Sequence, residues 1–138
     1  MGANIYTKLL IARKDGYNMK IAVTSAGKDL NADLDPRFGR AAYFIIVDSD
    51  TMDFEAVENR QNLNLPQGAG IQAGKTIVDN KAEVLITGHC GPKAFKVLRA
   101  AGVKIVTGGS GTVADAIEKY KNGELKPTAV ADVEGHWV

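Results

Sequence analysis

The sequence predicts a single α/β domain with a mixed five-stranded sheet and helices on its faces. One observation is the order of the patterns: three apolar, strand-like segments precede the first helical pattern, and short strands then alternate with helices. The other is size, because 138 residues with 45% hydrophobic and 24% charged content suit one globular domain. The order is β-β-β-α-β-α-β-α, and an antiparallel meander followed by right-handed crossovers then gives a mixed sheet.

The predicted domain spans residues 19–125. Residues 1–18 are predicted to be a flexible N-terminal extension, because Met19 and the apolar run after it read like a protein start entering a first strand. An extra edge strand over residues 6–12 is the alternative for this extension. Residues 126–138 have no hydrophobic period and are predicted to be a C-terminal tail.

The first half of the domain reads as an antiparallel meander. Residues 21–23 form a short buried strand, and a polar loop over residues 26–40 follows. The strongly apolar residues 43–47 predict a second strand. A tight turn at residues 48–50 leads to residues 54–58, which alternate and predict a third strand paired to the second as a hairpin.

The second half alternates helices and strands. Helices are predicted at about residues 71–80 and 92–101, and strands at residues 84–86 and 103–106. The last helix is indicated by apolar residues at i, i+3, i+4 and i+7, which mark one buried face. These residues are Val113, Ala116, Ile117 and Tyr120, and the helix stops are Gly102 and Asn122-Gly123.

This topology places several loops on one rim, where ligands of open α/β sheets bind. The strands that end there are the first, third, fourth and fifth, and the second strand begins there. The loops expected on this rim are Thr24-Ser25, Arg37 to Arg40, Gly68 to Gly70, Gly88 to Pro92 and Thr107 to Gly111.

Composition excludes several classes of protein. A net charge of +1 gives no basic field for nucleic acid. The apolar runs are too short to span a bilayer, so no membrane partner is expected. A single cysteine excludes an intramolecular disulfide framework and fits a reducing cytoplasm.

The turn Thr87-Gly88-His89-Cys90-Gly91-Pro92 joins a strand end to a helix start. Backbone N–H groups at a helix N-terminus attract anions, and sulfur and imidazole attract metals. Two ligands cannot hold a bare zinc ion well, so His89 and Cys90 predict a metal that arrives as a preformed cluster. The alternatives are that the Cys90 thiol is buried and structural or that it is catalytic. A catalytic thiol needs a base facing it, and the sequence offers none.

Two further loops are candidates for anion binding. Arg37 and Arg40 flank Phe38 and Gly39, and their guanidinium groups offer rigid hydrogen-bond donors to an anion. The alternative is a purely structural loop in which Phe38 packs into the core and the arginines are solvated. Residues 68–74 have the spacing G-x-G-x-x-x-G and follow a polar loop, so they do not match a dinucleotide fingerprint. They indicate a helix N-terminus with free N–H groups or a tight loop entry. A nuclease is excluded because strand ends carry Thr-Ser and Thr-Gly in place of acids.

A family resemblance rests on four motifs in order. They are Asp35-Pro36-Arg37-Phe38-Gly39-Arg40, Gly68-Ala69-Gly70-Ile71-Gln72, Thr87-Gly88 with Gly91-Pro92-Lys93-Ala94, and Gly123-Glu124-Leu125. Over residues 19–125 the chain resembles the dinitrogenase iron–molybdenum cofactor biosynthesis family, which includes NifX, NafY and the C-terminal part of NifB. With Arg40-Ala41-Ala42 and Met52 it is also similar to the orange-protein type of sulfate-reducing bacteria, which carries a molybdenum–copper sulfide cluster.

The resemblance implies a ribonuclease-H-like fold and the binding, carriage or insertion of an anionic iron–molybdenum–sulfur or molybdenum–copper–sulfur cluster. It implies cluster donor and acceptor proteins as partners, and no turnover chemistry. The expected state is a monomer or weak dimer. The expected cluster-binding residues are Arg37, Phe38, Gly39, Arg40, Gly68, Gly70, Gly88, Gly91, Thr107 and Gly108, with His89 and Cys90 at the metal.

Two other functions remain open at this point. A non-metal regulatory module would dock a partner through the same rim. A nucleotide or phosphorylated-metabolite enzyme would use the glycine loop, although its spacing is imperfect.

Overall fold

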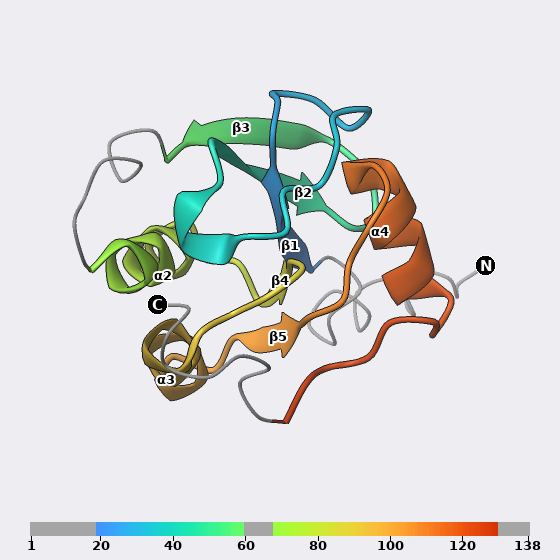
Figure 1. The fold of residues 1–138 in the computed structure, drawn as a ribbon. Helices are drawn as coiled ribbons and strands as arrows, with labels where there is room; N and C mark the ends of the chain where they lie inside the picture. The colour runs from blue at the N-terminus through green and yellow to red at the C-terminus, as the bar shows by residue number, and fades with distance from the viewer. Residues whose placement is uncertain (1–18, 60–67, 130–138) are drawn as a thin grey trace.

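The computed structural model describes residues 19–59 and 68–129. They form three layers, with a five-stranded sheet between helices α2 and α3 on one face and α4 on the other (Figure 1). The predicted single α/β domain with a mixed five-stranded sheet is confirmed. Residues 1–18, with the alternative strand at residues 6–12, and the tail from residue 130 lie outside the described residues.

The sheet has the strand order β3-β2-β1-β4-β5. β2 pairs antiparallel with β1 and β3, whereas β4 pairs parallel with β1 and β5. All five predicted strands are present, including the β2–β3 hairpin. Their bounds are β1 Lys20–Ser25, β2 Tyr43–Asp48, β3 Phe54–Glu58, β4 Val84–Ile86 and β5 Lys104–Val106.

The three helices follow the predicted periods with small shifts at their ends. They are α2 Ala69–Asp79, α3 Pro92–Ala100 and α4 Val113–Lys121. α2 begins two residues earlier than predicted, because Gly68 at its N-cap takes a left-handed conformation that starts the helix at once. A 3₁₀ turn, η2, spans Phe38–Arg40 in the loop before β2. This turn was not predicted, because three residues are too few to show a hydrophobic period.

Both faces of the sheet are covered, which explains the near-continuous apolar runs of its strands. In β1, Ala22 points into the core under α2 and α3, while Ile21 and Val23 point into the core under α4. Phe38 from η2 packs into the first core, with its ring centroid 5.6 Å from that of Phe44 on β2. The loop that carries the arginines is therefore fixed to the core by an aromatic anchor.

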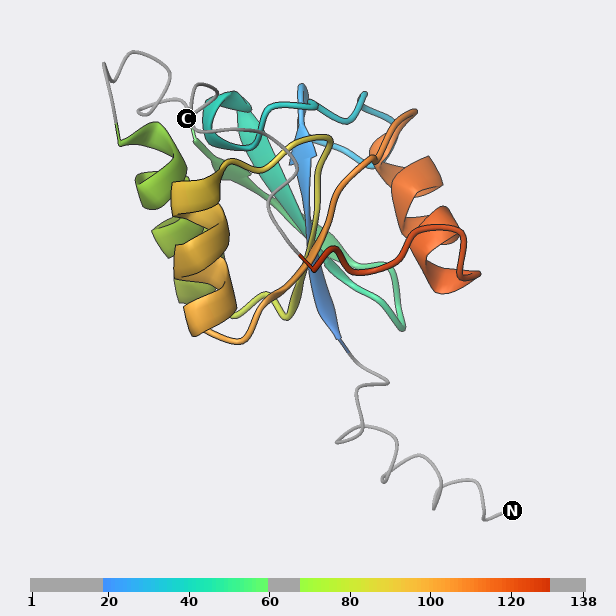
Figure 2. The ribbon, with the colours of Figure 1, turned by 60° about the horizontal axis from the view of Figure 1, so that its bottom comes forward.

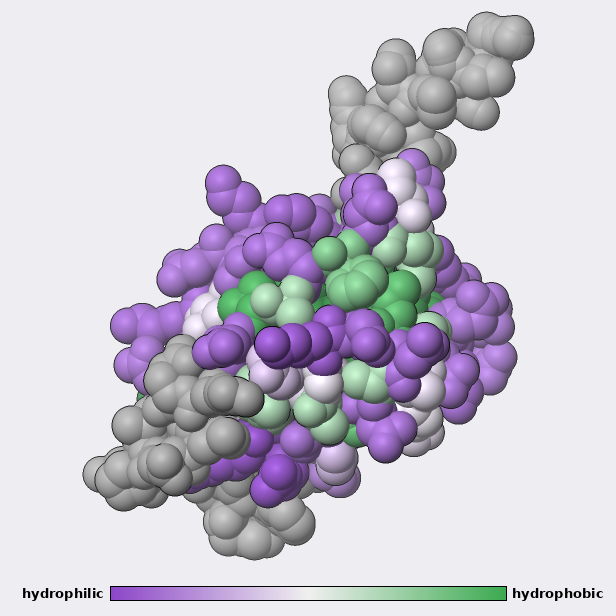
Figure 3. Space-filling model, turned by 90° about the horizontal axis from the view of Figure 1, so that it is seen from above, coloured by the Kyte–Doolittle hydropathy of each residue, from purple (hydrophilic) through white to green (hydrophobic). Residues whose placement is uncertain are grey.

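The edge formed by β3 is only partly covered. Its residues are half-buried or exposed, and Phe54 at its start is 42% exposed. Seen from above, over the β3 side of the molecule, apolar residues form a band between hydrophilic ones (Figure 3). This edge differs from the interior strands β1, β2 and β4, whose apolar side chains are buried.

The opposite edge, β5, is covered by the described part of the C-terminal tail. The Thr128 N–H donates to the Ile105 carbonyl (2.6 Å), and the Thr128 and Thr107 hydroxyls are 2.8 Å apart. The Arg99 guanidinium donates to the Ala129 carbonyl (2.9 Å). These bonds occupy backbone groups that an edge strand would otherwise leave open.

The rim predicted from the topology exists. The carboxyl ends of β1, β4 and β5 lie at the same end of the molecule as η2 and the N-termini of α2 and α3 (Figure 2). None of the helices in the described part of the chain has the length and hydrophobicity of a membrane span.

Helix α4 starts with its donors satisfied by its own side chains. The Thr112 hydroxyl accepts from the Asp115 N–H (3.0 Å), and the Asp115 carboxylate accepts from the Thr112 N–H (3.1 Å). Hydrogen bonds from the Thr112 backbone and side chain hold the pKa of Asp115 below its ordinary value of 3.8. This reciprocal cap fixes the end of α4 that faces the rim.

Thr112→Ala is expected to lower the free energy of unfolding by about 1 kcal/mol, because it removes an N-cap acceptor. Since the pKa of Asp115 is lowered in the folded protein, the stability it contributes is present above 3.8 and is lost as the pH falls through the lowered pKa. Urea unfolding at neutral and acid pH measures both effects. Thr76→Ala, in the middle of α2, is the control and should change the free energy of unfolding little. If it lowers stability as much as Thr112→Ala does, the proposed contribution of the Thr112 cap is wrong.

Candidate functional site

A pocket of about 130 Å³ lies on the rim, between η2 and the N-termini of α2 and α3. Two arginines and a histidine line it together with glycine-rich backbone. Its lining residues are Arg37, Phe38, Gly39, Arg40, Gly68, Ala69, Gly70, His89, Gly91 and Ala94. Three separate motifs that the sequence indicated thus meet in one cavity.

The arginine loop is held by local hydrogen bonds at its base. The Asp35 carboxylate accepts from the Arg37 N–H (3.0 Å) and lies 3.4 Å from Arg37 Nε. Below it, the Thr24 hydroxyl donates to the Asp35 carbonyl (2.6 Å) and is hydrogen-bonded to the buried Thr87 hydroxyl (2.9 Å). The Arg37 side chain stays 61% exposed, so its guanidinium is tethered without being buried.

Backbone pairing joins the arginine loop to the turn after β4. The His89 N–H donates to the Pro36 carbonyl (2.8 Å), and the Phe38 N–H donates to the His89 carbonyl (3.4 Å). Arg37 and His89 form an isolated parallel bridge. A Cβ at Gly88 would lie 2.7 Å from both Cα and Cβ of Pro36, so the two segments meet where only glycine fits.

Helices α2 and α3 run side by side and present their N-termini to the same pocket. Small residues permit this approach: a Cβ at Gly70 would lie 3.4 Å from the Ala94 Cβ, and one at Gly74 would lie 3.2 Å from Val97 Cγ1. Gly70 and Gly74 therefore serve helix packing.

The N-termini of α2 and α3 differ from that of α4. Neither Gly68 nor Gly91, their N-caps, supplies a side-chain acceptor, and neither helix has an acidic residue in its first turn. Pro92 has no N–H, so within the described residues the N–H groups left for other acceptors are those of the first turn of α2 and those of Lys93 and Ala94 in α3. With the helix dipoles and two guanidinium groups, they give the pocket a positive potential.

Asn59 is a supporting residue that sequence reasoning missed. It follows β3 and is fully buried, and its amide donates to the carbonyls of Ala41 (2.8 Å) and Gly39 (3.3 Å). It thereby fixes the exit of η2, which carries Arg40. The only available signal was a polar residue directly after a strand, which most often indicates a simple loop.

The structure separates the two residues expected at the metal. His89 is exposed and lines the pocket, whereas Cys90 is fully buried and packs in the core under α2 and α3. The Cys90 thiol lies 3.8 Å from the Gly91 carbonyl. Among the described residues, no group of three or more His, Cys, Asp or Glu side chains is placed to hold a metal ion.

Three other expected residues lie outside the lining of the pocket. Gly88 contacts Pro36, and the Gly108 N–H donates to the Gly88 carbonyl (3.0 Å). Thr107 is bonded to Thr128 at the β5 edge. Gly88 and Gly108 hold the turn that carries His89, whereas Thr107 contributes to the β5 edge.

Comparison with known proteins shows the family of the chain. Residues 19–123 match the family described as dinitrogenase iron-molybdenum cofactor, and this match covers most of the chain. The chain belongs to this family. Its members are associated with iron–molybdenum cofactor biosynthesis, which makes a carrier or binding role the family expectation.

Solved structures give the same relationship. The apo form of the orange protein from Desulfovibrio gigas is 42% identical, with a TM-score of 0.81 over 84% of this chain and 98% of that one. A putative NifB protein from Thermotoga is 36% identical, with a TM-score of 0.70 over 83% of this chain and 99% of that one. By sequence alone, an uncharacterised protein of Methanocaldococcus jannaschii is 26% identical over 70% of this chain and 83% of its own length.

Gly88→Ala is expected to destabilise the protein by about 3 kcal/mol, because the new methyl group meets backbone atoms of Pro36 that cannot rotate away. Urea unfolding measures the loss, and amide exchange at His89 should quicken as its bond to Pro36 breaks. Gly123→Ala is the control. A Cβ at Gly123 meets no atom within 4 Å, so only its positive φ of 85° disfavours alanine, and a loss of about 1 kcal/mol of stability is expected. Equal losses in the two variants would contradict the close packing at Gly88.

Proposed function

We propose that the pocket binds an anionic metal–sulfur cluster as cargo, of the iron–molybdenum-cofactor or molybdenum–copper sulfide kind, and that the protein carries it or helps to assemble it. The observation that carries the proposal is the lining of the pocket. Two guanidinium groups, one imidazole and two uncapped helix N-termini meet there, and no carboxylate side chain from the described residues lines it.

The donor set fits a preformed cluster better than a bare metal ion. Sulfide ligands of a cluster are negatively charged acceptors, which backbone N–H groups and guanidinium groups can hold by hydrogen bonds and charge. A bare ion needs several protein ligands, and the pocket offers one exposed imidazole within the described residues. Family membership and the similarity to an orange protein in its apo form support the same cargo.

Each part of the pocket has a proposed role. Arg37 and Arg40 balance the negative charge of the cluster, and the N–H groups at the starts of α2 and α3 donate to its sulfides. His89 is the proposed metal ligand, because its side chain is exposed at the pocket. Cys90 is proposed to act through packing beneath the turn, because its thiol is buried.

The roles of Arg37 and Arg40 are tested by anaerobic titration with tetrathiomolybdate and copper, followed by visible absorption. Arg37→Ala/Arg40→Ala is expected to weaken uptake at least about tenfold, because two charge-assisted contacts are lost. The control Lys119→Ala/Lys121→Ala removes the same charge from α4 and should bind like wild type. Unchanged uptake in the arginine variant would overturn the proposed site.

The metal ligand is tested in the same titration by comparing spectra. His89→Ala is expected to shift the absorption bands of the bound cluster, because a ligand is lost. Cys90→Ala is expected to keep the bands and to lower the thermal unfolding temperature, because it leaves a small cavity in the core. Identical bands for wild type and His89→Ala would exclude His89, and shifted bands in Cys90→Ala would assign the thiol.

A further inference from the structure

Positive and negative charges are segregated on this chain, although its net charge is only +1. Residues 84–114 contain no Asp or Glu, and residues 41–59 contain no Lys or Arg. The cations of the first segment are Lys93, Lys96, Arg99 and Lys104, and the carboxylates of the second are Asp48, Asp50, Asp53, Glu55 and Glu58. The second segment forms the β2–β3 hairpin, so the charged residues of the hairpin itself are all acidic.

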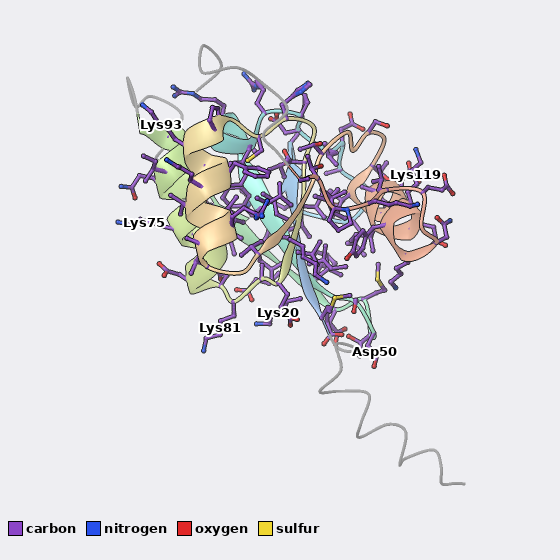
Figure 4. All side chains as sticks on the ribbon, turned by 90° about the horizontal axis from the view of Figure 1, so that it is seen from below. Lys20, Asp50, Lys75, Lys81, Lys93 and Lys119 are labelled. Carbon is purple, nitrogen blue, oxygen red and sulfur yellow. The ribbon has the colours of Figure 1, made fainter. Side chains whose placement is uncertain are left out.

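The cations gather on the outer side of α2 and α3. Lys93, Lys96 and Arg99 are exposed and spaced three residues apart on α3, so they form one stripe. Lys75 is exposed on the neighbouring helix α2, whose Gly74 packs against Val97 of α3. Figure 4 shows the labelled Lys75 and Lys93 on this side of the molecule, directed outward. We call Lys75, Lys93, Lys96 and Arg99 the basic face.

This arrangement costs local stability. Like charges three residues apart on a helix repel each other. Lys93 also lies in the first turn of α3, where the helix dipole disfavours a cation. Within the described residues, no carboxylate forms an ion pair with any member of the basic face. The Arg99 guanidinium does have a structural partner, the Ala129 carbonyl, but within the described residues no hydrogen bond or ion pair involves the side chain of Lys93 or Lys96.

The basic face begins at the mouth of the pocket. Gly91 and Ala94, on either side of Lys93 in sequence, line the cavity. A macromolecule that covers the outer side of α3 would consequently lie next to any cargo in the pocket. A surface of one sign steers and orients a partner that carries the opposite sign.

We propose that the basic face docks a protein with a complementary acidic surface, and that this partner delivers or receives the cluster. The handover rests on the proposed function, whereas the docking does not. A protein is favoured over nucleic acid because the stripe on α3 is about 9 Å long and offers few phosphate contacts.

Docking is tested without any cluster, using a fluorescent oligoglutamate peptide and its oligoglutamine counterpart in an anisotropy titration at low salt. The wild type is expected to bind the acidic peptide and to leave the neutral one unbound. Lys75→Glu/Lys96→Glu, two exposed positions outside the pocket, should weaken binding by more than about tenfold. The control Lys121→Glu/Lys126→Glu makes the same change in net charge elsewhere and should bind almost as wild type does.

Several outcomes would overturn the proposal. One is an equal loss of affinity for the acidic peptide in the basic-face variant and the control variant. Another is binding of single-stranded DNA through the basic face as tightly as the acidic peptide. A third is self-association that disappears in Lys75→Glu/Lys96→Glu, which would make a second copy of the chain the partner. Titration of the same proteins with tetrathiomolybdate separates the two proposals. If the wild type takes up no cluster but binds the peptide through the basic face, the proposed cargo is wrong and the proposed docking surface stands.

Discussion

The arrangement of the site depends on the short backbone pairing between Pro36–Phe38 and His89. This pairing joins a loop before β2 to a turn after β4, about fifty residues later in the chain. It requires Gly88, whose missing side chain lets the two backbones meet, and it is supported by the hydroxyl pair of Thr24 and Thr87. Because Phe38 is also fixed in the core, the arginines and the imidazole are held on one rigid frame.

The three helices show how one fold treats similar ends differently. α4 begins with a threonine and an aspartate that satisfy its first donors, and its N-terminus therefore has little capacity for an added anion. α2 and α3 begin with glycines and carry no acid in their first turns. Since Gly70 and Gly74 let these two helices pack closely, their dipoles add at one cavity.

Most of the architecture could be predicted because hydrophobic period and loop order are local properties. The apolar β2 strand and the α4 face were readable directly, and strand direction then placed the rim. The pocket was partly predictable, since its glycines and arginines follow strand ends. Asn59 and the packing role of Gly74 were not, because each depends on contacts with residues distant in sequence. The burial of Cys90 likewise depends on how the turn enters α3, which sequence spacing does not determine.

The tether between Asp35 and Arg37 has a consequence for exchange. An anion that enters the pocket can contact the Nη groups of Arg37 while the Asp35 carboxylate stays next to Nε. The carboxylate partly offsets the positive charge that Arg37 offers to such an anion. The tether between Asp35 and Arg37 therefore weakens the attraction between this arginine and a bound anion and favours the release of the anion.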